Sequence, residues 1–159
     1  MEHKLPFEKR LEYPIGDNLR YNLNMIESMN EMLYKILHEY YPGKKVMLFC
    51  RGSSGAILAA MASLHLIKKQ REVFICHIKK DGEESHSGNP YSARYERKEN
   101  VLVVIDDFIS SGATISSIIK HGINATGRRN LKMDILCVSG IVPENMKNSF
   151  EHIMYSKQD

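Results

Sequence analysis

The chain has 159 residues, of which 43% are hydrophobic, and 22 basic against 19 acidic side chains give it a net charge of +3. This length favours one compact domain with a buried core. So small a basic excess argues against a nucleic-acid partner but suits a small anionic ligand such as a phosphate. The three cysteines lack metal-type spacing, and no apolar run reaches the ~18 residues of a membrane span. We therefore expect reduced thiols in a cytoplasmic protein without a membrane partner.

The first half of the chain alternates between helical and strand-like patterns. Apolar residues spaced by three and four predict an amphipathic helix over residues 17–40. A short apolar run at 46–50 predicts a buried strand, and a helix over 54–70 and a second strand over 73–78 follow. The positions of the first helix predicted to face the core are Leu19, Leu23, Ile26, Met29, Leu33, Ile36, Leu37 and Tyr40.

The second half continues this alternation after a polar stretch without period at residues 79–100. Strands are predicted at 101–105, 134–138 and 150–155, and a helix at about 114–121. Continuous apolar strands that alternate with helices predict an α/β fold with a mostly parallel central sheet flanked by helices. In such folds ligands bind beyond the carboxyl ends of the strands.

Chemistry-bearing residues follow the strand at 101–105 in the run "VLVVIDDFISSGAT". Free backbone N–H groups, hydroxyls and the dipole of the next helix converge there, which is typical of a phosphate site. Two carboxylates would repel a phosphate, but they accept hydrogen bonds well from the hydroxyls of a ribose. The run therefore predicts a ribose 5-phosphate site. Its residues are Asp106, Asp107, Ser110, Ser111, Gly112, Ala113 and Thr114.

The run "VVIDDFISSGAT" resembles the phosphoribosyl pyrophosphate (PRPP) signature of type I phosphoribosyltransferases. The resemblance implies that Asp106 and Asp107 hold the ribose hydroxyls and that residues 110–114 hold the 5-phosphate. The run "RGSSG" at 51–55 resembles the pyrophosphate loop of the same family, often with a non-proline cis peptide nearby. The pyrophosphate residues implied in this way are Arg51, Gly52, Ser53, Ser54, Gly55, Lys79 and Lys80.

The resemblance implies transfer of the 5-phosphoribosyl group from PRPP to a nucleobase with release of pyrophosphate. Arg51, Asp106 and Asp107 are the implied catalytic residues, and Mg²⁺ would arrive mainly with the PRPP oxygens, without a metal site of the protein. A homodimer is implied. The chain would form one domain over 1–159, with a core at about 43–142 and a hood over the base drawn from 1–42 and 143–159. A regulator that binds PRPP or a nucleotide without turnover is the alternative.

Other interpretations of these motifs stay open at this level. "RGSSG" alone also fits an ordinary strand-to-helix turn with Ser54 as the N-cap, and Lys79 and Lys80 also fit solvated surface charges. Residues 81–99 fit either a lid that closes over the reacting centre or a solvated insertion. Relatives that use hypoxanthine or guanine usually have an aspartate where this chain has Ser110, a poor base, so we expect either that 6-oxopurines are poor substrates or that another group takes the proton. Orotate and adenine stay open as acceptors.

Overall fold

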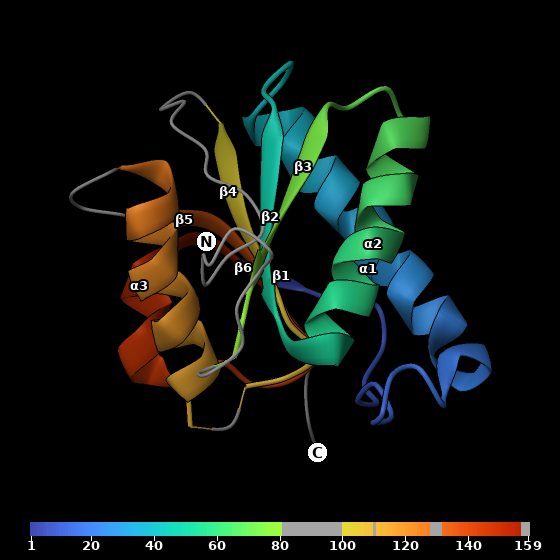
Figure 1. Ribbon diagram of the computed structural model, residues 1–159. Coiled ribbons are helices and arrows are strands. Elements are labelled where there is room, and N and C mark those ends of the chain that lie inside the picture. The colour runs from blue at the N-terminus through green and yellow to red at the C-terminus, as the bar shows by residue number, and fades with distance from the viewer. Residues whose placement is uncertain (81–99, 110, 128–131, 157–159) are drawn as a thin grey trace.

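The computed structural model describes residues 1–80, 100–109, 111–127 and 132–156. Six parallel strands form one sheet in the order β1-β6-β5-β4-β2-β3 (Figure 1). The strands are β1 (Glu2–Lys4), β2 (Val46–Arg51), β3 (Val73–Ile78), β4 (Val101–Ile105), β5 (Met133–Cys137) and β6 (Phe150–Tyr155). The helices are α1 (Leu19–Tyr40), α2 (Gly52–Lys68), α3 (Ala113–Thr126) and the 3₁₀ helix η1 (Glu144–Ser149). The predicted parallel α/β fold is confirmed.

Helices cover both faces of the sheet, with α1 and α2 on one face and α3 on the other (Figure 1). Alternate residues of the central strands point to opposite faces, so each face has its own apolar core. Val103 and Ile105 of β4 pack on the side of α1 and α2, whereas Leu102 and Val104 pack on the side of α3. Burial on both faces explains why these strands are continuous apolar runs rather than alternating ones.

The predicted core face of α1 is wrong at both ends of the helix. Leu19, Leu23 and Tyr40 are 40%, 42% and 37% exposed, whereas Asn22 is fully buried. Asn22 lies one turn before Ile26 on the buried stripe, and its amide bonds the backbone of a neighbouring segment instead of packing against apolar side chains. A polar residue can take a core position when its hydrogen bonds are satisfied there.

The chain changes direction along the sheet between β2 and β4. From β2 it crosses through α2 to β3 at one edge, whereas from β4 it crosses through α3 to β5 and then continues to β6. The two crossovers lie on opposite faces of the sheet (Figure 1). The carboxyl ends of β2 and β4 therefore border a topological switch point, which is where open α/β sheets bind their ligands.

Residues 5–18 connect β1 to α1 and cross the carboxyl ends of the strands; we call them the N-terminal segment. The N–H of Leu5 donates to the carbonyl of Tyr155 at the end of β6, with a distance of 2.7 Å. Farther along, the N–H of Leu11 donates to the hydroxyl of Ser139, just beyond β5, at 3.4 Å. The segment thus passes from the edge of the sheet toward its centre.

Candidate active site

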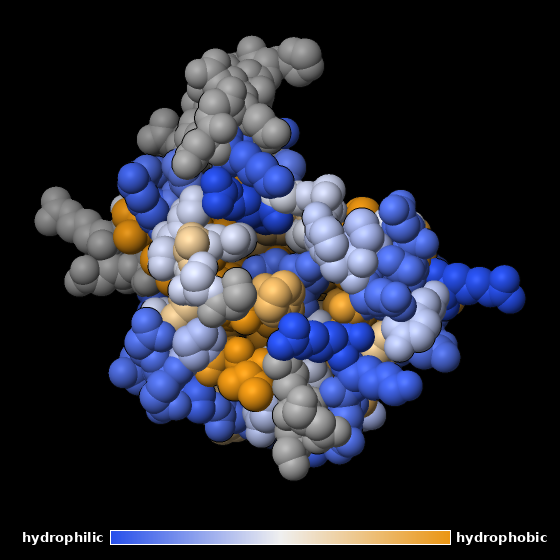
Figure 2. Space-filling model, turned by 90° about the horizontal axis from the view of Figure 1, so that it is seen from below, coloured by the Kyte–Doolittle hydropathy of each residue, from blue (hydrophilic) through white to orange (hydrophobic). Residues whose placement is uncertain are grey.

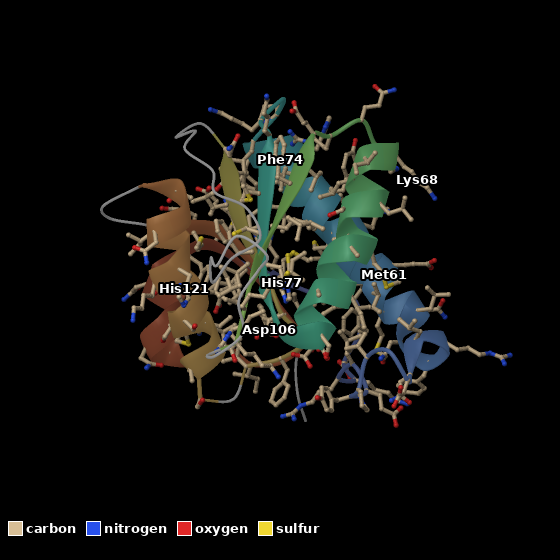
Figure 3. The ribbon with its side chains drawn as sticks, viewed as in Figure 1. Met61, Lys68, Phe74, His77, Asp106 and His121 are labelled. Carbon is tan, nitrogen blue, oxygen red and sulfur yellow. The ribbon has the colours of Figure 1, made fainter. Side chains whose placement is uncertain are left out.

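Asp106 and Asp107 follow β4 directly, and Figure 3 shows Asp106 at the carboxyl end of the sheet. The N–H of Asp106 continues the ladder by donating to the carbonyl of Cys137 at 2.9 Å. The N–H of Asp107 donates to Oδ1 of Asp106, and the N–H of Phe108 donates to Oδ1 of Asp107, both at 2.9 Å. Each carboxylate is therefore held by the backbone of the next residue, which fixes its orientation at the end of the strand.

Asp106 is only 6% exposed, and its pKa is raised from 3.8 to about 8, above all by this burial. A hydrogen bond with the carboxyl group of Asp107 and the charge of that group contribute to the same rise, while the hydrogen bond from the N–H of Asp107 opposes it. Near neutral pH the carboxyl group of Asp106 thus keeps a proton in the free protein. Hydrogen-bond donors or positive charge brought by a ligand would favour its ionised form, so the pair is suited to a ligand with several hydroxyls.

The turn after β2 brings the pyrophosphate-loop residues to the end of the neighbouring strand. Arg51 is extended, and Gly52 has a φ of +74°, a left-handed conformation that favours glycine. A Cβ on Gly55 would lie 3.4 Å from Cβ of Cys50 and 3.6 Å from the carbonyl oxygen of Ile105, so the first turn of α2 packs against the ends of both β2 and β4. Within the described residues the only cis peptide bond precedes Pro14, so the expected cis peptide near this loop is not observed.

Lys80 reaches the same turn from the edge strand. Arg51 pairs with Ile78 in the register of β2 and β3, so the residues after Ile78 continue beside the pyrophosphate loop. Cε of Lys80 lies 3.7 Å from the position that a Cβ would take on Gly52. The Nζ of Lys79 lies 3.5 Å from Nδ1 of His77. The structure therefore brings Lys80, rather than Lys79, close to the backbone of the loop.

The start of α3 supplies the third part of the site. Gly112 caps this helix with a φ of +82°, and a Cβ there would lie 2.4 Å from the sulfur of Met146 in η1. The N–H of Ala113 lies 3.3 Å from the hydroxyl of Ser111, and the first helical bond runs from Ser116 to Gly112. Both the backbone conformation and the close packing of Met146 explain the glycine.

Sequence reasoning missed residues that hold the N-terminal segment over the strand ends. Ser139 is fully buried, and both its N–H and its hydroxyl donate to the carbonyl of Asp107. Asn22 binds the N–H and the carbonyl of Glu12 at 2.7 and 2.8 Å. For Asn22, the one signal in the sequence was its helical spacing from apolar residues of α1 that were predicted to face the core. Ser110 and the proposed lid at 81–99 lie outside the described residues.

The three loops described above meet at one end of the molecule. Figure 2 views this end, where hydrophobic side chains are exposed near the centre and hydrophilic residues surround them. The exposed apolar residues beyond the strands include Phe108, at 37%, and Ile141, at 56%. Beside them a cavity of about 670 Å³ is lined by the N-terminal segment and Tyr21. The arrangement combines paired carboxylates, a helix N-terminus, basic side chains and an apolar surface, which suits a phosphorylated sugar and a flat ring.

Comparison with known proteins identifies the family. The phosphoribosyl transferase domain family matches residues 16–137, which include the turn after β2, the two aspartates and the start of α3. The chain therefore belongs to this family, and the predicted class of enzyme, a phosphoribosyltransferase, is confirmed. A search of curated protein sequences gives no match.

Solved structures of low sequence identity share the fold. A hypoxanthine-guanine phosphoribosyltransferase from Bacillus anthracis is 18% identical, with a TM-score of 0.55 over 79% of this chain and 71% of that one. A hypoxanthine-guanine-xanthine phosphoribosyltransferase is 15% identical, with a TM-score of 0.56 over 85% and 75% of the two chains. A hypoxanthine phosphoribosyltransferase from Staphylococcus aureus is 13% identical, with a TM-score of 0.53 over 86% and 74%.

The described residues form neither a metal cluster nor a membrane span. No group of three or more His, Cys, Asp or Glu side chains in residues 1–80, 100–109, 111–127 and 132–156 could hold a metal ion. In the same part of the chain, no helix has both the length and the apolar character needed to cross a membrane.

All three cysteines are free and buried, and burial raises the pKa of the Cys50 thiol to about 12. Burial also raises the pKa of the Cys137 thiol, so Cys50 and Cys137 stay protonated at neutral pH.

Proposed function

We propose that the protein transfers the 5-phosphoribosyl group of PRPP to a nucleobase and releases pyrophosphate. The observation that carries this proposal is the convergence of two loops at the switch point between β2 and β4. One loop offers Arg51 and the backbone of Gly52, and the other offers Asp106 and Asp107 followed by the start of α3. A pyrophosphate on the first loop and a 5-phosphate on the second would place the ribose between them.

The reaction needs charge stabilisation at both ends of the breaking bond. As the bond from C1 to pyrophosphate breaks, the ribose gains positive charge and the pyrophosphate gains negative charge. Arg51, Lys80 and the N–H groups of 52–55 would stabilise the leaving pyrophosphate, with Lys79, Ser53 and Ser54 at the border of this site. Asp106 and Asp107 would hold the ribose hydroxyls, while Ser110, Ser111, Gly112, Ala113 and Thr114 would bind the 5-phosphate.

The residues of this site fit a Mg²⁺ ion that arrives bound to the oxygens of PRPP. The two adjacent carboxylates provide oxygen donors of the kind that Mg²⁺ prefers, but they are too few to form a metal cage by themselves. When bound, the ion would neutralise charge on the pyrophosphate oxygens. Asp106 and Asp107 would face the complex from the ribose side, and Arg51 would face it from the pyrophosphate side.

The N-terminal segment is our proposed hood. Of the candidate ranges 1–42 and 143–159, most residues belong to β1, α1, η1 and β6, which pack into the sheet or against it. Among the residues of these two ranges that the structure describes, only 5–18 cross the strand ends outside regular structure. The chain would thus be a single domain over 1–159 with its core at about 43–142 and a short hood on one side of the ribose site.

A homodimer in the cytoplasm completes the proposal, with PRPP and a nucleobase as ligands and neither nucleic acid nor a membrane as a partner. The outer face of α2 supports the dimer because Leu64 and Ile67 are 57% and 55% exposed next to the edge strand β3. Sedimentation velocity of the wild type should give the mass of two chains. Leu64→Lys with Ile67→Lys should give the mass of one chain, whereas a dimer unchanged by both would place the interface elsewhere.

A non-catalytic regulator with the same fold is the alternative function. Enzyme and regulator would both bind PRPP, so binding alone does not separate them. The test is release of pyrophosphate from Mg-PRPP in the presence of each of several purine, pyrimidine and pyridine bases. Release that depends on one base and disappears in Asp106→Asn with Asp107→Asn would support the enzyme. PRPP binding without release for any base would favour the regulator.

A further inference from the structure

The side chain of Arg10 covers the residue that follows the two aspartates. Its Cζ lies 5.0 Å from the centroid of the Phe108 ring, which is a cation–π contact between a planar guanidinium and an aromatic face. Phe108 is 37% exposed, and Arg10 is exposed as well. The pair thus lies at the surface one residue from Asp107, next to the proposed position of the ribose.

Hydrogen bonds through Ser139 connect the backbone next to Arg10 to the backbone of Asp107. The next residue, Leu11, donates its N–H to the hydroxyl of Ser139. That hydroxyl and the N–H of Ser139 both donate to the carbonyl of Asp107, the N–H at 3.0 Å. One buried serine therefore connects the residue beside Arg10 to the residue before Phe108. Arg10 is held at the site by this connection and not only by its contact with the ring.

Two acidic residues and one lysine lie within two positions of Arg10 in the sequence. The carboxylate of Glu8 lies 3.8 Å from Nζ of Lys4, and the side chain of Glu12 is exposed to solvent. Lys9 adds another exposed cation beside Arg10. A flat ligand next to Phe108 would thus meet a guanidinium, which donates to carbonyl and carboxylate oxygens but has no acceptor for an amino group.

The chemistry of transfer favours the same kind of ligand. The acceptor's ring nitrogen forms a bond to C1 while the bond from C1 to pyrophosphate breaks and its electron pair leaves with the pyrophosphate. A proton on that nitrogen, where one is present, must pass to a base, and the serine at position 110 is a poor one. A nitrogen without a proton, or with an acidic proton that water accepts, avoids this need.

We propose that Arg10 is a specificity-determining residue that selects heteroaromatic acceptors carrying negative charge at neutral pH through a carboxylate or an acidic ring. This inference rests on the proposed phosphoribosyl transfer and names its acceptor class. Electron-withdrawing carbonyl or carboxylate groups supply both features that the site requires, an oxygen for the guanidinium and a ring nitrogen that needs no protein base. Acceptors whose only exocyclic group is an amine offer neither.

The experiment measures pyrophosphate release from Mg-PRPP with nicotinate, orotate and xanthine as anionic acceptors and with adenine and hypoxanthine as neutral ones. At least one anionic acceptor should exceed both neutral bases in kcat/KM by about tenfold or more. Arg10→Gln should raise the KM of that acceptor by about tenfold with little change in kcat, and Arg10→Lys should fall between the two because it keeps the charge but not the planar fork. Arg20→Gln, an exposed arginine on α1, is the matched control and should change KM less than about twofold.

A preference for adenine or hypoxanthine, no turnover of any anionic acceptor, or an acceptor ratio unchanged by Arg10→Gln would each overturn the inference. Pyrophosphate release with the neutral bases separates this failure from that of the proposed function: release with adenine or hypoxanthine alone would leave phosphoribosyl transfer in place, whereas no release with any base would overturn the transfer itself. Calorimetric titration with Mg-PRPP adds a second readout. Wild type and Arg10→Gln should bind PRPP equally, because Arg10 lies on the acceptor side. If the wild type itself does not bind PRPP, the proposed phosphoribosyl transfer is wrong, and the inferred class of acceptor is wrong as well.

Discussion

The proposed ribose-phosphate side of the site and the proposed acceptor side are assembled from parts that lie at different distances in the sequence. Asp106, Asp107 and Gly112 come from one stretch of 14 residues, 101–114, at the end of a buried strand. On the acceptor side, Leu11 bonds Ser139 across 128 positions. The first side is therefore fixed by the sheet, whereas the second is a segment without regular structure held by a few polar contacts. Substitutions on the acceptor side can change the acceptor without unfolding the protein.

The largest effect should follow removal of both carboxylates from the ribose-phosphate side. Asp106→Asn with Asp107→Asn removes two charged acceptors, each worth roughly 1.5 to 3 kcal/mol in hydrogen bonds to the ribose, so PRPP affinity should fall by about 10² to 10⁴-fold. Calorimetric titration with Mg-PRPP measures the loss. The control is Asp17→Asn, an exposed aspartate in the N-terminal segment, which should bind PRPP normally. Unchanged affinity of the folded double variant would show that the ribose lies elsewhere.

The next effect concerns how the carboxyl group of Asp106 changes the free energy of unfolding of the ligand-free protein with pH. Its pKa in the folded protein, about 8, exceeds its ordinary value of 3.8, so between these pH values the folded state keeps a proton that the unfolded state has released. The free energy of unfolding should therefore fall as pH rises from about 4 to about 8, by an amount on the order of a few kcal/mol. Asp106→Asn has no such proton, so urea unfolding should show its advantage over the wild type growing from pH 5 to pH 8. A constant difference across that range would contradict the raised pKa.

A smaller effect is expected at the start of α3. Gly112→Ala places a Cβ in a left-handed conformation and against Met146, so it should lower the free energy of unfolding by about 1 to 2 kcal/mol and weaken PRPP binding. Gly127 is a matched control because it is also left-handed, at +68°, but no heavy atom of the described residues lies within 4 Å of the position that a Cβ would take there. Gly127→Ala should cost about 1 kcal/mol in stability and leave PRPP affinity unchanged. Equal losses of affinity in both variants would argue against a phosphate site at α3.

The same contrast explains how much could be predicted from the sequence. Strands β2 and β4 are buried on both faces, and β3 pairs with β2 along its whole length. Their apolar runs could therefore be recognised in the sequence, and their bounds agree with the prediction to within one residue. The paired aspartates and the serine-glycine run follow β4 directly in the sequence, so the proposed ribose-phosphate site could be predicted as one motif. Strand β1 was missed because three residues, Glu2–Lys4, carry no periodic signal and form a strand only by pairing with β6.

The acceptor side could not be predicted because its contacts are not local. Arg10 is one charged residue among several near the N-terminus, and nothing in the sequence connects it to Phe108. Asn22 interrupts an apolar pattern in which Leu19 and Leu23 were the obvious core residues. Only the position of the N-terminal segment, which depends on the complete fold, decides that the asparagine is buried and the leucines are exposed.

The smallest effect should follow from loosening the N-terminal segment at Asn22. Asn22→Ala removes the two hydrogen bonds to the backbone of Glu12, which water can replace because that backbone is only part-buried, so the free energy of unfolding should fall by about 1 kcal/mol. Because Arg10 would be held less firmly over Phe108, the KM of the acceptor should rise by about threefold while the dissociation constant of PRPP stays the same. Steady-state kinetics and calorimetry measure the two quantities, and Asn24→Ala, on the exposed side of α1, is the matched control. If Asn22→Ala weakens PRPP binding as much as it raises the acceptor's KM, the segment supports the whole site, and the division into two independently built sides is wrong.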